Sequence, residues 1–172
     1  MPITHEGAMR ADGKRFAVIA ARFNEFMVSK LVEGALDALR RSGAADEDVE
    51  IFRCPGAFEI PGVLRHVADS GRFQGAVCLG VVIRGATPHF DLVVKEATAG
   101  VARIAAEARI AVGNGVLACE TIEQAVERAG SKAGNRGFDA AMVAIEMANL
   151  YAGDALAAQP ASAAPARKLS GR

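Results

Sequence analysis

Short apolar runs alternate along the chain with longer stretches in which apolar residues are spaced more widely. Four of the apolar runs predict β-strands, and they span Arg15–Ala21, Val49–Cys54, Gly75–Ile83 and Ile110–Ala118. The third run, "GAVCLGVVI", is apolar at every position, which is typical of a central parallel strand covered on both faces. The residues before the first run show no periodicity and are expected to form an extended N-terminal arm, residues 1–14.

The stretches between these runs carry apolar residues at helical spacing. In "EFMVSKLVEGALDALRRSG" the spaced apolar residues predict a helix that ends at basic residues followed by Gly43. Further helices are expected over residues 58–70, 88–109, 121–129 and 138–151. Thr121 and Gln124 have the spacing of a capping box, and "GSKAGNRG" is expected to be a loop between the last two helices.

Strand and helix therefore alternate four times. This order predicts an α/β fold, a three-layer αβα sandwich around a four-stranded parallel sheet of the flavodoxin-like or Rossmann-like kind. Residues 15–151 are expected to form a single domain. Residues 152–172 are rich in Ala, Pro and Ser without an apolar stripe, which predicts a disordered tail.

Composition narrows the functional classes. Twenty basic and 20 acidic residues balance, so no charge excess indicates a nucleic-acid partner or a membrane surface. No apolar run approaches the roughly 18 residues that a membrane span needs, and the N-terminus lacks a signal-peptide pattern. Cys54, Cys78 and Cys119 lie in or beside apolar runs and are expected to be buried free thiols. We therefore expect a soluble cytoplasmic protein.

Each predicted strand runs into an unusual segment: "ARFNEF", "CPGAFEIPG", "RGATPHF" and "GNGVLACE". Ligands of parallel α/β sheets bind outside the carboxyl ends of the strands. The four segments are therefore expected to surround one pocket.

The segment "RGATPHF" combines an anion site with a histidine. Thr87 is expected to cap a helix that starts with Pro88, which would leave the N–H groups of residues 85–87 beside the positive end of the helix. His89 would lie in the first turn, where the helix dipole favours a neutral imidazole that can accept a proton. The alternative is that His89 only caps the helix or serves packing.

Three further side chains fit a ligand site. Phe23 and Phe58 can offer flat surfaces for stacking, and Glu59 can accept hydrogen bonds, although phenylalanine usually packs in a core. Arg128 could be a phosphate-binding fork or an ordinary surface charge. Neither a dinucleotide-binding glycine motif nor a P-loop occurs, and the histidines lie far from clustered metal ligands. We expect an aromatic ligand and an anion, with neither a metal nor a redox cofactor.

Five segments, in this order, carry a family resemblance: "ARFNEF", "PGAFEIP", "GVVIRGATPHFD", "TIEQAVERAGSKAGNRG" and "AIEMANLY". They resemble the motifs of the lumazine synthase family over roughly residues 15–151. The resemblance implies condensation of 5-amino-6-(D-ribitylamino)uracil with 3,4-dihydroxy-2-butanone 4-phosphate, with release of phosphate and water and without a cofactor. This is the penultimate step of riboflavin biosynthesis. A non-catalytic flavin- or lumazine-binding protein, or a shell protein, on the same scaffold is the alternative.

The resemblance also implies a role for each site residue. His89 transfers protons, and Phe23 stacks on the pyrimidine. The ribityl side is lined by Ala57, Phe58 and Glu59, and the uracil edge meets main-chain groups of Val81, Val82 and Ile83. The phosphate is held by Ala86, Thr87 and Arg128. Asn114 stands where many members have a phenylalanine that reaches the ligand from a neighbouring subunit. A homo-oligomer built on pentamers is implied, and we expect a closed shell of roughly sixty subunits. The resemblance also makes riboflavin synthase a candidate partner.

Overall fold

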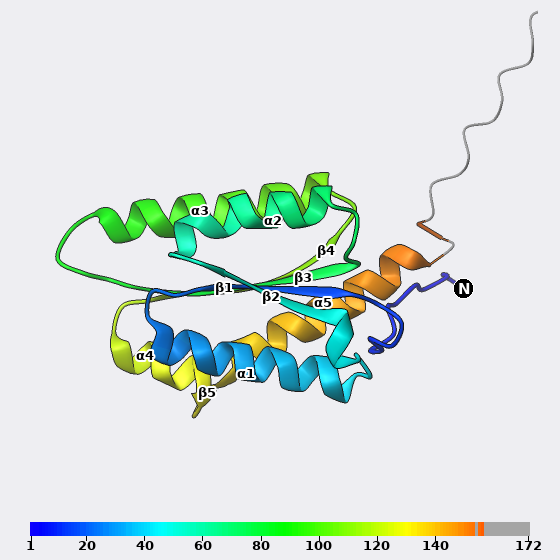
Figure 1. Ribbon diagram of the computed structural model, residues 1–172, viewed down its shortest axis with the longest axis horizontal. Helices are drawn as coiled ribbons and strands as arrows, with labels where there is room; N and C mark the ends of the chain where they lie inside the picture. Colours follow the sequence, from blue (N-terminus) through cyan, green and yellow to red (C-terminus); the bar gives the residue numbers. More distant parts are fainter. Residues whose placement is uncertain (154, 157–172) are drawn as a thin grey trace, which may run out of the picture.

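Four parallel strands form one sheet between two layers of helices (Figure 1). The computed structural model describes residues 1–153 and 155–156. The strands β1 (Phe16–Ala21), β2 (Val49–Cys54), β3 (Gly75–Ile83) and β4 (Ala111–Cys119) lie in the order β2-β1-β3-β4. Helices α2 (Ile60–Asp69) and α3 (His89–Glu107) cover one face, and α1 (Glu25–Arg41), α4 (Ile122–Arg128) and α5 (Arg136–Ala152) cover the other. The predicted sandwich is confirmed, whereas residues 154 and 157–172 of the predicted tail lie outside the described residues.

The core has one half on each side of the sheet, and β1 contributes to both. All six residues of β1 are buried, with Phe16, Val18 and Ala20 facing α1 and α5, and Ala17, Ile19 and Ala21 facing α2 and α3. Fully burying a large aliphatic or aromatic side chain stabilises a fold by about 1.5–3 kcal/mol. An apolar residue at every position of β1 and β3 is therefore what a central strand between two helix layers requires.

Helix α5 lies very close to its neighbours because two glycines lack side chains. A Cβ atom at Gly113 of β4 would overlap the carbonyl group of Ala140, and one at Gly137 would overlap the carbonyl group of Leu31. The glycine at position 113 thus permits contact between the strand and α5, and does not mark a turn.

Several boundaries differ from the sequence prediction. The expected loop "GSKAGNRG" contains a small antiparallel hairpin, β5 (Ala129–Ser131) and β6 (Gly134–Asn135), and α5 begins at Arg136, two residues earlier than expected. Asn135 sets this start, because its side-chain oxygen accepts hydrogen bonds from the N–H groups of Gly137 and Phe138 at 2.9 and 3.2 Å. Before α2, the chain forms a 3₁₀ turn over Ala57–Glu59, in place of the start of an α-helix.

The N-terminal arm has neither helix nor strand but is not free of the domain. The Ala11 N–H donates to the carbonyl of Ser42 at 2.8 Å, and Asn149 donates to the carbonyl of Arg10, also at 2.8 Å. Ala11 is fully buried in the core, whereas Met1 and Ile3 are exposed. The arm is therefore attached to the domain around residues 10 and 11, at the ends of α1 and α5.

Candidate functional site

A cavity of about 730 Å³ opens at the carboxyl ends of three strands. Its walls are residues 23–24 after β1, residues 55–59 after β2, residues 81–83, 85 and 87 at the end of β3, and residues 89, 90, 92, 93 and 96 of α3. Its volume falls within the range of small-molecule sites, about 300–1,000 Å³. The structure thus brings Phe23, Ala57, Phe58, Glu59, Val81, Val82, Ile83, Thr87 and His89 around one space.

The wall after β1 is held by main-chain bonds and one asparagine. The Arg22 and Phe23 N–H groups donate to the carbonyls of Cys54 and Pro55 at 2.8 and 3.0 Å, so β1 stays beside β2 past its last strand residue. Asn24 then adopts a left-handed conformation with φ 59°, which asparagine tolerates better than most residues, and its amide donates to the Val81 carbonyl at 2.7 Å. Sequence reasoning missed Asn24, although an asparagine directly before a helix is a usable signal.

Two phenylalanine rings are exposed at the cavity. The side chain of Phe23 is 73% exposed and that of Phe58 is 59% exposed, so the alternative that these rings pack in the core is wrong. Phe58 lies in the 3₁₀ turn, which closes because Glu59 accepts a hydrogen bond from the Gly56 N–H at 2.9 Å. The rings give the cavity two apolar surfaces on which a planar ligand could stack.

The predicted cap at Thr87 is wrong. Helix α3 begins at His89 and its N-cap is Pro88, whose carbonyl accepts hydrogen bonds from the N–H groups of Asp91 and Leu92 at 3.1 and 3.4 Å. The proline ring fixes φ at a helical value, −63° here, so the first turn closes on Pro88 and no side chain caps it. Thr87 instead lines the cavity.

His89 is exposed on the cavity wall at the first position of α3. Within the described residues the imidazole makes no hydrogen bond, so His89 neither caps the helix nor packs in the core. Its ring is therefore open to a bound molecule.

Three of the expected site residues do not line this cavity. Ala86 lies in the loop between Gly85 and Thr87 but is not part of the wall. Asn114 lies in the middle of β4, exposed and in register with Cys78. Arg128 ends α4, where it donates to the carbonyl of Gln124 at 3.0 Å. The prediction that "GNGVLACE" lies at the end of its strand as a pocket segment is wrong, since residues 113–119 pair with β3 throughout.

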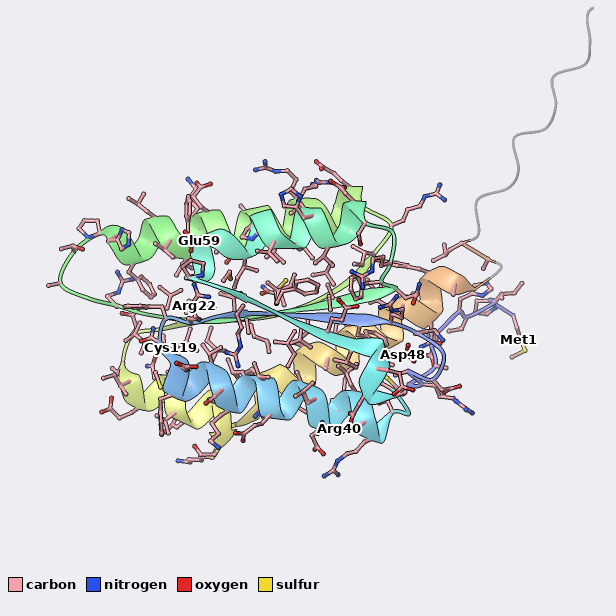
Figure 2. The ribbon with its side chains drawn as sticks, viewed as in Figure 1. Met1, Arg22, Arg40, Asp48, Glu59 and Cys119 are labelled. Atoms are coloured by element: carbon pink, nitrogen blue, oxygen red, sulfur yellow. The ribbon has the colours of Figure 1, made fainter. Side chains whose placement is uncertain are left out.

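Arg84 was not singled out from the sequence, although it directly precedes the cavity loop. Its guanidinium donates to the carboxylates of Asp91 and Glu120. The hydrogen bond to Asp91, and to a smaller extent the one to Glu120, raises the pKa of Arg84. The hydrogen bond from Arg84 lowers the pKa of Asp91. Figure 2 shows Glu59, Arg22 and Cys119 at this same end of the molecule, far from Met1.

The cysteines lie outside the cavity wall. All three are free and buried, as predicted, and burial raises the pKa of Cys78 to about 12. In the part of the chain that the structure describes, no three His, Cys, Asp or Glu side chains gather as a metal site. None of the helices described is long and apolar enough to cross a membrane.

Comparison with known proteins identifies close relatives. The family model described as 6,7-dimethyl-8-ribityllumazine synthase matches residues 13–152. A protein of that name from Chlorobium phaeobacteroides is 58% identical over 146 residues, which are 85% of this chain and 94% of the relative. One from Desulfatibacillum aliphaticivorans is 57% identical over 150 residues, covering 87% and 97%. A third, from Chlorobaculum tepidum, is 55% identical over 146 residues, covering 85% and 94%.

Proposed function

This chain belongs to the 6,7-dimethyl-8-ribityllumazine synthase family, and from that premise we propose how its cavity carries out the reaction. The reaction condenses 5-amino-6-(D-ribitylamino)uracil with 3,4-dihydroxy-2-butanone 4-phosphate and releases phosphate and water. The observation that carries the proposal is that one cavity combines two exposed phenylalanine rings with an exposed histidine at a helix N-terminus. A purely binding or structural protein would need no proton acceptor there.

The pyrimidine stacks on Phe23, and its polar edge meets the main chain of residues 81–83. Strand β3 extends past β1, because the last paired residues are Leu79 and Ala20. The Val81 carbonyl, on the β1 side of β3, accepts a hydrogen bond from the Asn24 amide. Main-chain groups of alternate residues in a strand point to the same side, so those of Ile83 are also directed away from β4 and are open to a ligand.

The ribityl chain extends along residues 57–59, where Glu59 supplies an acceptor. One carboxylate oxygen of Glu59 accepts a hydrogen bond from the Gly56 N–H, which fixes the orientation of the carboxylate. Ala57 and Phe58 form the apolar part of the same wall.

The phosphate binds at the loop of residues 85–87, in front of α3. The helix has 19 residues, and its dipole favours an anion at this end. A Cβ atom at Gly85 would meet nothing within 4 Å, so the space beside this residue is open. Arg128 and Asn114 of the partner subunit complete the pocket in this proposal, which accounts for their distance from the cavity of their own chain.

His89 moves the protons of the reaction. The amine of the pyrimidine attacks the ketone and water is lost, and removal of a proton from substrate carbon then lets phosphate leave. The imidazole at the first position of α3, beside the phosphate, is placed to accept that proton. The ribitylamino nitrogen attacks the remaining carbonyl carbon, and loss of a second water closes the ring. The reaction transfers protons and expels phosphate and water without oxidation, so we propose no cofactor.

The function is tested with the purified protein and both substrates. Fluorescence of the lumazine should appear at a rate well above the rate without protein, and omission of either substrate should abolish it. A rate equal to the uncatalysed one would overturn the proposed function.

The assembly is a homo-oligomer built on pentamers, and we propose a closed shell of about sixty subunits. Apolar side chains are exposed away from the cavity, on Phe26, Ile122, Val126 and Val143, where a second copy could cover them. The catalytic domain spans residues 15–151. We place the protein in the cytoplasm, with riboflavin synthase as a candidate partner. Light scattering should show a particle of about a megadalton, whereas an active monomer would contradict the shared pocket.

A further inference from the structure

Arg84 connects three elements at the mouth of the cavity. It follows the last residue of β3, and its N–H donates to the Cys119 carbonyl of β4 at 2.9 Å. Its Nε donates to Glu120 at 2.6 Å, and its two Nη atoms donate to the two carboxylate oxygens of Asp91 at 3.0 and 3.1 Å. One side chain thus joins the ends of two strands to the first turn of α3.

The plane of the guanidinium is also fixed. Its carbon lies 4.3 Å from the centre of the Phe90 ring, and Phe90 is buried. A guanidinium that stacks on a ring and binds a carboxylate through two nitrogens has one favoured orientation, which an ammonium group cannot reproduce. The geometry is therefore specific to arginine.

The loop between Arg84 and Asp91 carries cavity residues. Gly85, Thr87 and His89 line the cavity, whereas Arg84 itself does not. Within the part of the chain that the structure describes, residues 84–91 make no side-chain hydrogen bond other than those of Arg84. The contact between Arg84 and Asp91 is thus the side-chain hydrogen-bonded connection across this loop among the described residues.

We propose that Arg84 is a positioning residue, which holds the phosphate-binding loop and His89 in their working geometry without touching the substrates. This inference rests on the proposed function for the identity of the ligands. Its role differs from that of a stabilising surface ion pair, because exposed pairs contribute little to stability, whereas a small displacement of reacting groups lowers the rate strongly.

The test compares Arg84→Met with Arg84→Lys and Asp91→Asn. In Arg84→Met we expect kcat to fall about 10- to 100-fold and the KM of the phosphate-bearing substrate to rise, since a misplacement of about 1 Å can cost that much. The KM of the pyrimidine should change by less than about twofold, because Phe23 and residues 57–59 stand on other loops. Arg84→Lys and Asp91→Asn should give intermediate losses, since each keeps part of the contact.

Arg65→Met is the matched control. Arg65 also pairs with two carboxylates, of Asp69 and Glu107, and its side chain is 38% exposed, as is that of Arg84. It lies on α2 outside the cavity wall, so its loss should leave both KM values and kcat unchanged. Light scattering and thermal melting of every variant check that assembly and folding are retained.

Affinity for inorganic phosphate, measured by calorimetry, separates this inference from the proposed function. Arg84→Met should weaken phosphate binding about tenfold relative to Arg65→Met, whether or not lumazine forms. Unchanged phosphate affinity and kcat in Arg84→Met would overturn the inference, as would equal losses in Arg65→Met. If Arg84→Met does not fold, the lysine and asparagine variants decide by the same criteria.

Discussion

Phe23 and Phe58, at the carboxyl end of the sheet, differ in exposure from Phe73 at its amino end. At the carboxyl end, Phe23 and Phe58 are largely exposed. At the amino end, Phe73 is 5% exposed, with the guanidinium carbons of Arg15 and Arg72 at 5.5 and 5.0 Å from its ring centre. Figure 2 shows these ends on opposite sides, with Glu59 and Arg22 at one and Asp48 at the other.

Charges at the amino end are paired around the covered ring. Glu50 accepts hydrogen bonds from both Arg15 and Arg72, and Phe52 meets Phe73 edge-on with the ring centres 5.9 Å apart. Among the residues that the structure describes, none with a carboxylate, imidazole or thiol lines a hollow of about 620 Å³ at this end. The amino end is therefore built for stability, and the carboxyl end leaves apolar rings and an imidazole open to a ligand.

The largest effect on stability is expected at the amino end. Phe73→Ala should lower the free energy of unfolding by about 3–5 kcal/mol, as removal of a buried phenylalanine commonly does. Denaturant unfolding measures the loss, and the activity per folded molecule should stay near that of the unchanged chain. A specific loss of activity without a loss of stability would remove the contrast between the two ends.

His89→Ala should slow lumazine formation by about 10- to 1,000-fold, because general acid–base groups contribute about 10²–10⁴ and proximity alone sustains part of the reaction. Single-turnover fluorescence gives the rate, and calorimetry checks that substrates still bind. Unchanged kinetics would exclude His89 from the mechanism.

Arg128→Ala is expected to act mainly on the phosphate-bearing substrate. Hydrogen bonds to charged groups contribute about 1.5–3 kcal/mol, so the KM of this substrate should rise by roughly 10- to 150-fold while that of the pyrimidine changes little. Equal shifts of the two KM values would contradict a phosphate-binding role.

Phe23→Ala gives the smallest expected effect and completes the comparison with Phe73. Since the ring is exposed, its removal should change the free energy of unfolding by no more than about 0.5 kcal/mol. Affinity for the pyrimidine should fall by about 0.5–1.5 kcal/mol, the usual contribution of an aromatic pair. Calorimetry and denaturant unfolding on the same sample measure both quantities, and a large loss of stability would assign Phe23 to the core.

Local pattern alone determined most of the architecture. The run Gly75–Ile83 is a strand at the predicted residues, and Thr121 caps α4 through the predicted bond to the Gln124 N–H at 3.2 Å. Both depend on neighbours within a few positions, where the periodicity of apolar residues and capping chemistry operate. The position of the cavity also followed, because parallel strands place their carboxyl ends together.

Tertiary structure decided the features that depend on residues distant in the sequence. Asn135 starts α5 and also donates to the Lys30 carbonyl at 2.8 Å, across 105 positions. Gly113 has no side chain and so permits close contact with α5. Asn114, the next residue of the strand, lies away from the cavity. Arg84 meets Glu120 only because β3 and β4 are neighbours in the sheet. A one-dimensional pattern records which side chains are available, whereas their partners depend on how the folded sheet brings its strand ends together.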